Sequence, residues 1–584
     1  MHSIKQRRPD VYKASQRRKL SAMAPRLDTL PHSILEECAF RVALSSEWGS
    51  LGDLPNLLLT SRRLYATLTY PLCVSLYARL FCALFPVNHF IAPSPSITDV
   101  VLAQELVDRL RIIRRVRRCQ LDDNYIRIDL WRLYFMLLES DGAIAERLQE
   151  IGLPRFLVAF YRSQLYRSAT QNHDLPLAND ISAIAVWLSW YTMSEEPLHT
   201  ESVETREEVL TRIRPFTMNC PQMNSSLRTL SAISDAGVTL SGHHAQDLCD
   251  VTHFSQRLTL SCPNLSSAAI LLTFARKDAL VVHTPQHLNI GVSYQGRGPT
   301  IQDCYQFQAQ SKATSSPSLA FRTQTLSIHG FSGQTVCPDD LRRLFSHRLR
   351  NTLYEGSLYA LGRMSGSWSG KLLVSPVIPR SSGATAAGLP DFLCQRPFQC
   401  NLREYIRYHA NLEQSQSQDV WRINDDDIVS WCQDMQRFDV LHRTGSLELH
   451  ERASGRIERY ELVPPAPVGG IDTFQSSQPA DVLIAGETDL EHDRAWGAFV
   501  FFGRVRLRDG WVILKRQPKR IDDPAQPEFG TWLFEGYVRA GSIFVGRWRP
   551  DPTLHPSGGC EGIFRLNKIA QDRLRIQGGI RAVL

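Results

Sequence analysis

The hydrophobic pattern of this chain changes once along its length, from a helical period to an alternating one. Up to about residue 285 apolar residues recur at spacings of three and four, which predicts helices at 129–140, 153–166, 181–193 and 225–237. Beyond that point apolar and polar residues alternate, and Gly and Trp become frequent, which predicts strands. We therefore expect a helical part followed by a β-rich part.

Two stretches in the β-rich part, 497–516 and 530–549, repeat one another. Each carries the pattern big–x–big–x–Gly–x–Val, so that Gly503 matches Gly536, and Asp509-Gly510 supplies a tight turn in the first. A face of large aromatic residues, with glycines that let the strand bend, is typical of a closing barrel. Strands at 362–375 and 561–568 are expected to join the same antiparallel sheet.

Residues 54–68, LPNLLLTSRRLYATL, concentrate apolar side chains in a short stretch. Most of them fall on one broad helical stripe, but Leu59 lies off it, so the helix is apolar on more than one side. Such a helix has to be covered on several sides. It belongs either to the centre of a large core or to a small module that docks on a partner.

The residues around this stretch follow the order Leu-Pro-x-x-Ile-Leu, then Asp-Leu, then Leu-x-x-Thr-Ser-Arg-x-Leu, with an inserted SSEWGS between the first two parts. This order resembles the F-box, a three-helix module. The resemblance implies that the module docks on the adaptor Skp1 and so joins a cullin–RING ubiquitin ligase. The implied docking residues are Leu30, Pro31, Ile34, Leu35, Leu54, Leu57, Leu58, Ser61, Arg62 and Leu64.

The β-rich part resembles the barrel-like substrate domain of a subgroup of F-box-only proteins and of many fungal F-box proteins, which implies a receptor for a protein substrate. Alternation puts Trp548 on the face opposite Arg547 and Arg549. With the indole inside, the two arginines face outward near Tyr537 and Arg539. These four residues are the candidate substrate site, and the alternative is that the arginines only keep the sheet face soluble.

The predicted fold class is multidomain α+β, with a three-helix F-box, an irregular helical region and a C-terminal antiparallel β-barrel-like domain. The expected boundaries are a basic disordered tail at 1–25, the F-box at 26–70, the helical region at 71–285 and the β-domain at 286–584. Linker-like composition places loop insertions at 310–318, 380–388 and 464–480.

Charge adds little to this picture. The net charge is +7, and residues 1–20 hold seven basic residues against one aspartate, so the body of the chain is almost neutral and no nucleic acid partner is expected. The two basic clusters of the tail are spaced as in a bipartite nuclear-import signal, but a solvated, disordered arm is the more common explanation of such clusters. The arginine-rich segment 109–118 is expected to be a solvated helix face.

The cysteine pattern and the most apolar segment of the sequence indicate in which cellular compartment the protein is expected. Thirteen scattered cysteines without a C-x-x-C pair favour reduced thiols inside the cell, in the cytoplasm, the nucleus or both. The apolar segment 71–92 contains Arg79 and Pro86, so we expect a buried helix and no membrane association.

Catalytic motifs are missing from the sequence. GSWSG at 366–370 has Trp368 where a nucleophile elbow needs serine, and no P-loop, zinc spacing or dinucleotide fingerprint occurs. Asp425 to Asp427 offer carboxylates to a metal ion, but they also suit a helix start. We expect a non-enzymatic receptor without cofactor or metal.

Two alternatives to a ligase receptor stay open. Trp368 on an early strand and Arg565 on the last strand are arranged as in lipocalin-like barrels, which stack a cation over an indole and bind small ligands. The second alternative is an F-box protein with a scaffolding role outside ubiquitin transfer.

Overall fold

The computed structural model describes most of the chain, and all structural statements below refer to these residues. They are 27–45, 47–86, 97–140, 143–167, 178–193, 198, 200–218, 248–278, 299–313, 344, 359–376, 394–408, 437–464, 479–507, 509–519, 530–539, 541–551 and 560–569. The basic tail, the predicted helix at 225–237, the insertion at 380–388 and Asp425 to Asp427 lie outside them. The chain divides into two compact units, 1–118 and 119–584.

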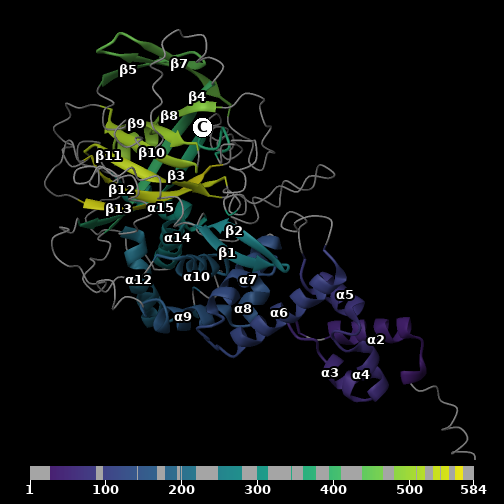
Figure 1. Cartoon of the computed structure of the whole chain (residues 1–584). Helices are drawn as coiled ribbons and strands as arrows, with labels where there is room; N and C mark the ends of the chain where they lie inside the picture. Colours follow the sequence, from purple (N-terminus) through teal and green to yellow (C-terminus); the bar gives the residue numbers. More distant parts are fainter. Residues whose placement is uncertain are drawn as a thin grey trace, which may run out of the picture. The chain divides into compact units, whose positions relative to one another are not determined.

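The first unit is helical (Figure 1). A short 3-10 turn precedes five helices, and the three helices of the F-box-like segment are followed by two more in the same unit. Their bounds are η1 (Leu27–Thr29), α2 (His32–Leu44), α3 (Leu54–Leu59), α4 (Arg62–Leu68), α5 (Val74–Leu84) and α6 (Asp99–Arg117).

The inserted segment between α2 and α3 has a structural role within this unit. The Trp48 indole donates to the carbonyl of Leu84 at 3.0 Å, and Arg117 donates to the carbonyl of Trp48 at 2.7 Å. Arg109 on α6, expected on a solvated face, is instead buried, and its Nε donates to Glu105 at 3.0 Å. The two hydrogen bonds of Trp48 thus connect the inserted segment to α5 and α6 within the same unit.

The second unit begins with packed helices and one hairpin. The predicted helices at 129–140, 153–166 and 181–193 are confirmed, whereas 248–261 is a β-hairpin inside the region expected to be helical. The elements are α7 (Ile126–Glu139), α8 (Ala145–Glu150), α9 (Leu153–Ser163), α10 (Asp180–Tyr191), α12 (Val203–Met218), β1 (Leu248–His253), β2 (Gln256–Ser261), α14 (Leu265–Asp278) and α15 (Ile301–Ala313). Helix α15 includes the first residues of the insertion expected at 310–318.

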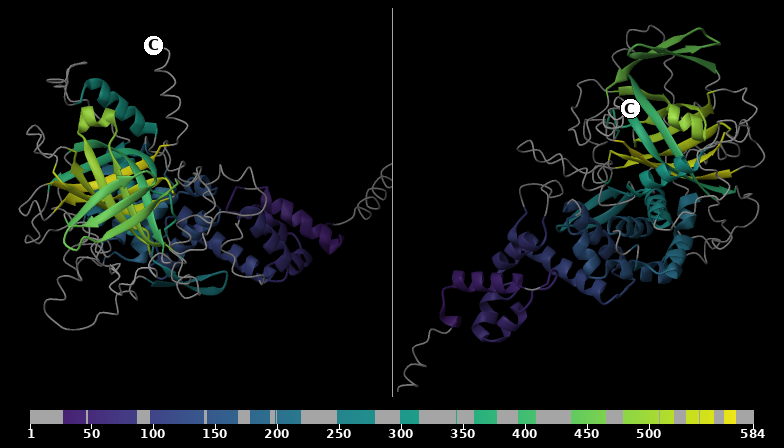
Figure 2. Two further views of the ribbon diagram at one scale, coloured as in Figure 1. Left: turned by 90° about the horizontal axis from the view of Figure 1, so that it is seen from above. Right: turned by 180° about the vertical axis from the view of Figure 1, so that it is seen from behind.

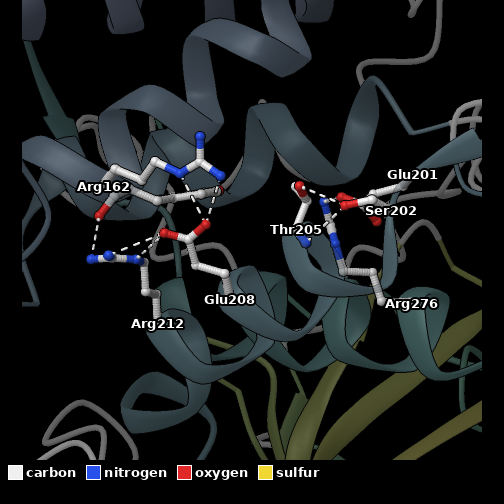
Figure 3. A network of polar contacts seen from close by, with 8 residues as sticks. Arg162, Glu201, Ser202, Thr205, Glu208, Arg212 and Arg276 are labelled. Carbon is white, nitrogen blue, oxygen red and sulfur yellow. Dashed lines mark hydrogen bonds and ion pairs between the residues drawn. The ribbon is translucent and has the colours of Figure 1, made fainter.

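Carboxylate–arginine contacts tie α9, α12 and α14 together (Figure 3). Glu208 on α12 bonds Arg162 of α9 at 2.7 Å, in a partly exposed position. Glu201, just before α12, is close to two largely buried arginines, Arg276 on α14 at 3.1 Å and Arg206 on α12 at 3.8 Å. One side of the network is therefore solvated and the other is buried.

We expect Glu201→Gln to destabilise the protein by about 2–3 kcal/mol, because it removes the negative charge that two buried guanidinium groups share. Glu208→Gln is the matched control, and it should leave the melting temperature nearly unchanged because water screens that pair. Thermal unfolding of the full-length variants measures both. Equal shifts for the two variants would contradict this view of the network.

The C-terminal part of the second unit is a closed eight-stranded antiparallel β-barrel (Figure 2). Each strand pairs with its neighbour, and β3 closes the barrel by pairing with both β13 and β4. The strands are β3 (Gly366–Pro376), β4 (Cys394–Tyr408), β8 (Pro479–Glu487), β9 (Phe499–Arg506), β10 (Trp511–Pro518), β11 (Trp532–Arg539), β12 (Ile543–Pro550) and β13 (Cys560–Lys568).

Alternation along these strands fills the barrel with apolar side chains. Trp368, Phe534 and Trp548 are among the residues of one continuous buried cluster. The two predicted hairpins are β9–β10 and β11–β12, and Gly510 has φ +71° at the predicted turn. Gly546 on β12 pairs with Gly536 on β11, and a Cβ at Gly546 would lie 1.9 Å from the carbonyl oxygen of Glu535. These glycines allow two strands to approach closely.

Two further layers cover the outside of the barrel. A three-stranded extension, β5 (Phe438–Arg443), β6 (Ser446–Glu451) and β7 (Ile457–Val463), continues from β4 and packs its Leu447 and Leu449 onto outward residues of β8, β10 and β11. Helices α12 and α14 contact β12 and β13 instead, away from the extension (Figures 1 and 2). A short helix, α20 (Leu490–Trp496), joins β8 to β9.

None of the described helices combines the length and the apolar character that crossing a lipid bilayer requires.

Candidate functional site

The F-box-like residues separate into a buried set and an exposed set. Leu35, Leu54, Leu58 and Leu64 are buried between α2, α3 and α4, so they hold the three helices together. A substitution at one of these leucines would disturb the fold of the module as well as any docking. They are therefore poor positions at which to test docking.

Ile34 and Leu59 are the apolar residues of α2 and α3 that stay in water, with 47% and 79% of their surface exposed. Pro31 and Arg62 are also exposed, whereas Leu30 and Leu57 are half-buried. Covering exposed leucine and isoleucine side chains with a partner lowers the free energy, because their apolar surface leaves water. The module therefore has apolar side chains available for docking, but they are only partly those named from the motif.

Ser61 has a local role in this module. It is the N-cap of α4, where its hydroxyl accepts a hydrogen bond from the backbone N–H of Arg63 at 3.2 Å. The Thr60 hydroxyl donates a hydrogen bond to the carbonyl oxygen of Leu57 at 2.7 Å. The Thr-Ser-Arg part of the motif thus forms the junction between α3 and α4, and this accounts for its sequence without a partner.

The four residues of the expected substrate surface lie on the outer face of the barrel, and Trp548 points inside as alternation predicted. Tyr537 is covered by the β5–β7 extension. The guanidinium of Arg539 lies over the Trp187 ring of α10, with its carbon 5.3 Å from the ring centre. These two residues are buried by their own chain, so they do not form an open surface.

Arg547 and Arg549 are nearer to water, and both have acidic neighbours on adjacent strands. Arg547 lies 3.7 Å from Glu561 on β13, and Arg549 lies 2.7 Å from Glu535 on β11. A substrate carboxylate would have to compete with these ion pairs.

At one end of the barrel a buried carboxylate holds the segment that covers this end. Glu404 on β4 accepts hydrogen bonds from the Tyr359 hydroxyl at 2.8 Å and from the backbone N–H of Gly362 at 2.7 Å. Burial raises the pKa of Glu404, and these donors act in the opposite direction. The segment 359–365 is thereby fixed over this end, where Tyr359 and Met364 join the barrel core.

The cation stacked on Trp368 at this end is not the one expected. Arg565 points outward and lies over Trp190 of α10 at 5.4 Å, whereas the Lys568 ammonium lies 5.8 Å from the centre of the Trp368 ring. The arrangement of a cation over an indole is present, but it uses the residue three positions further along β13.

The opposite end of the barrel holds a buried arginine that the sequence analysis missed. Arg516, near the end of β10, has 4% of its surface exposed, and its guanidinium carbon lies 3.5 Å from the centre of the Trp532 ring and 4.0 Å from that of Phe499. Burial, together with the nearby charge of Arg396, lowers the pKa of Arg516 well below its usual range. Alternation with Val512 and Leu514 is the signal that places this side chain inside.

Among the described residues, no group of three histidine, cysteine, aspartate or glutamate side chains is arranged to hold a metal ion. The sequence matches no protein-family model, no curated protein and no solved structure.

Proposed function

We propose that this chain is the substrate-recognition subunit of an SCF-type ubiquitin ligase, with its F-box on Skp1 and a protein substrate on its β-domain. The observation that supports it is the F-box-like order of residues, which falls on three short helices that bury Leu35 and Leu58 and leave Ile34 and Leu59 exposed. A closed barrel further along the chain suits a receptor domain.

In this role the chain performs no bond chemistry. It tethers a substrate near the ubiquitin-charged enzyme of the cullin–RING complex, so that a substrate lysine meets a high effective concentration of thioester. The proposal includes a location in the cytoplasm or nucleus, where that complex operates. Arg547 and Arg549 on β12 are the proposed substrate contacts, because they are nearer to the surface than Tyr537 and Arg539.

A small-ligand-binding barrel is the second candidate. The closed eight-stranded topology favours it, as do the cation over Trp368 at one end and the buried Arg516 at the other. The two candidates are compatible, since docking involves the first unit of the chain and ligand binding involves the second.

Docking on Skp1 is tested with the full chain and with its variants Ile34→Asp and Leu59→Asp. Each should weaken binding by at least about tenfold, because the interface would have to bury an unpaired carboxylate in place of an apolar anchor. Leu490→Asp on α20 is the matched control, since Leu490 is as exposed as Leu59 but lies in the other unit. Interferometry against purified Skp1 measures the affinities.

Failure of the wild-type chain to bind Skp1 would refute the proposed function, and so would full affinity in both F-box variants. Co-purification of the cullin separates the ligase from a scaffold. If the chain binds Skp1 but neither recruits a cullin nor supports ubiquitin transfer, it has the scaffolding role.

A further inference from the structure

The Arg516 end of the barrel has an electrostatic imbalance among its described residues. A guanidinium group keeps its positive charge at physiological pH, and moving it out of water is costly unless an anion or hydrogen-bond acceptors compensate. The rings of Trp532 and Phe499 supply part of that compensation. They supply no hydrogen-bond acceptors for the guanidinium N–H groups.

Two guanidinium atoms of Arg516 lack any hydrogen-bond partner within the described part of the chain. These atoms are Nε and Nη2, and both are buried. They lie on the same edge of the guanidinium plane, which is the edge that binds the two oxygens of one carboxylate. Arg506 on β9 shows this geometry, with Nε 2.9 Å from one oxygen of Asp509 and Nη2 2.5 Å from the other.

The acidic side chains close to this end have other partners. Asp489 caps α20 by accepting from the backbone N–H of His492 at 2.8 Å. Lys519 pairs with Asp493 at 2.8 Å and with Glu487 at 3.2 Å. Each carboxylate is therefore engaged outside the barrel interior. None of the described ion pairs includes Arg516.

A second buried polar atom without a partner in the described structure lies at the same end. His492 of α20 packs beside Phe499, with ring centres 6.4 Å apart, and its Nε2 is buried and unpaired. Its Nδ1 lies 3.1 Å from the carbonyl oxygen of Gly497, so Nδ1 carries the proton and Nε2 can accept a hydrogen bond. Burial lowers the pKa of His492, with Arg516 contributing in the same direction.

From the buried and unpartnered Nε and Nη2 of Arg516 we propose that the Arg516 end of the barrel binds an organic carboxylate. Its two oxygens accept from Nε and Nη2 of Arg516, and its apolar body contacts Phe499 and the edge of the Trp532 ring, whose two faces are covered by Arg516 and Trp548. The inference does not depend on the proposed docking on Skp1, and its test involves no other protein.

The probe is phenylacetate, with phenylacetamide as the neutral counterpart of the same shape. Binding to the full-length protein is measured by calorimetry and by tryptophan fluorescence, because Trp532 would contact the ligand. We expect phenylacetate to bind at least about tenfold more tightly than phenylacetamide. Arg516→Met, which keeps an apolar side chain of similar length, should abolish this preference, and Arg443→Gln at an exposed arginine of β5 should retain it.

Melting temperature separates a binding role of Arg516 from a structural one. A binding arginine carries an uncompensated cost in the free protein, so Arg516→Met should melt at the same temperature as the wild type or higher. A lower melting temperature, with no carboxylate preference in the wild type, would assign Arg516 to stacking alone and overturn the proposal. Absence of phenylacetate binding up to about 10 mM would also overturn it.

A free acid and an acidic side chain of a polypeptide carry the same group. A second arm therefore uses a capped tetrapeptide with one aspartate beside a phenylalanine. Tighter binding of the peptide than of phenylacetate would assign the site to a polypeptide, and the reverse order would assign it to a small acid. In both cases the Arg516→Met variant must lose the binding, or the site lies elsewhere.

Discussion

Replacing Gly546 by alanine should unfold the barrel at a much lower temperature than the wild type. A Cβ there would lie 1.9 Å from the Glu535 carbonyl oxygen and 2.6 Å from the Cα of Gly536, and no side-chain rotation relieves a clash with backbone. The two strands would have to separate where they are paired. We expect a loss of at least about 3 kcal/mol, the upper range for overpacked interiors.

Gly445, in the turn between β5 and β6, is the control for this substitution. It has φ +79°, and a Cβ there would meet no atom within 4 Å. Alanine should therefore cost only the strain of a left-handed backbone, about 1–2 kcal/mol. Calorimetry of the full-length proteins compares the two. If Gly546→Ala melts no lower than Gly445→Ala, the strands are not as close as described.

Breaking the buried pair of Lys515 and Asp551 should have an effect of similar size. The ammonium lies 2.8 Å from the carboxylate, and both side chains are almost completely buried. Asp551→Ala would leave a buried ammonium without its counter-charge, and we expect a loss of about 3–5 kcal/mol.

The double variant Lys515→Met with Asp551→Ala tests the cause of that loss. Removing both charges also removes the unpaired ammonium, so the double variant should be more stable than Asp551→Ala alone. Thermal unfolding of the wild type, Asp551→Ala, Lys515→Met and the double variant completes a double-mutant cycle. A double variant as unstable as the single one would mean that Asp551 acts through its other contacts.

Much of the barrel could be predicted because its strands obey local rules. The repeat in 497–516 and 530–549 gave the two hairpins, and alternation placed Trp548 inside, where the structure has it. The matched positions Gly503 and Gly536, which were expected to let the strand bend, are sites of close strand approach. The pairing of β3 with β13 joins the first and last strands of the barrel, which lie far apart in the sequence, and no local pattern specifies it.

The covering of the barrel could not be predicted, because alternation assigns a residue to a face without showing what packs on that face. Tyr537 and Arg539 do face outward, but the extension and α10 lie over them. The hairpin at 248–261 was missed since it is short and lies among helices. Arg516 was missed because Lys515-Arg516 at a strand end resembles a solvated charge pair, although the alternation places it inside.

The eleven-stranded sheet ends at β5, and this has a consequence for self-association. The barrel strands are all paired on both sides, whereas β5 pairs only with β6 among the described strands. An unpaired strand edge is where another chain can add a strand and begin an aggregate. Here the edge is short and carries Asp439, His442 and Arg443, with Asp439 bound to Arg452 at 2.7 Å. Charge on this six-residue strand therefore opposes edge-to-edge polymerisation of the sheet.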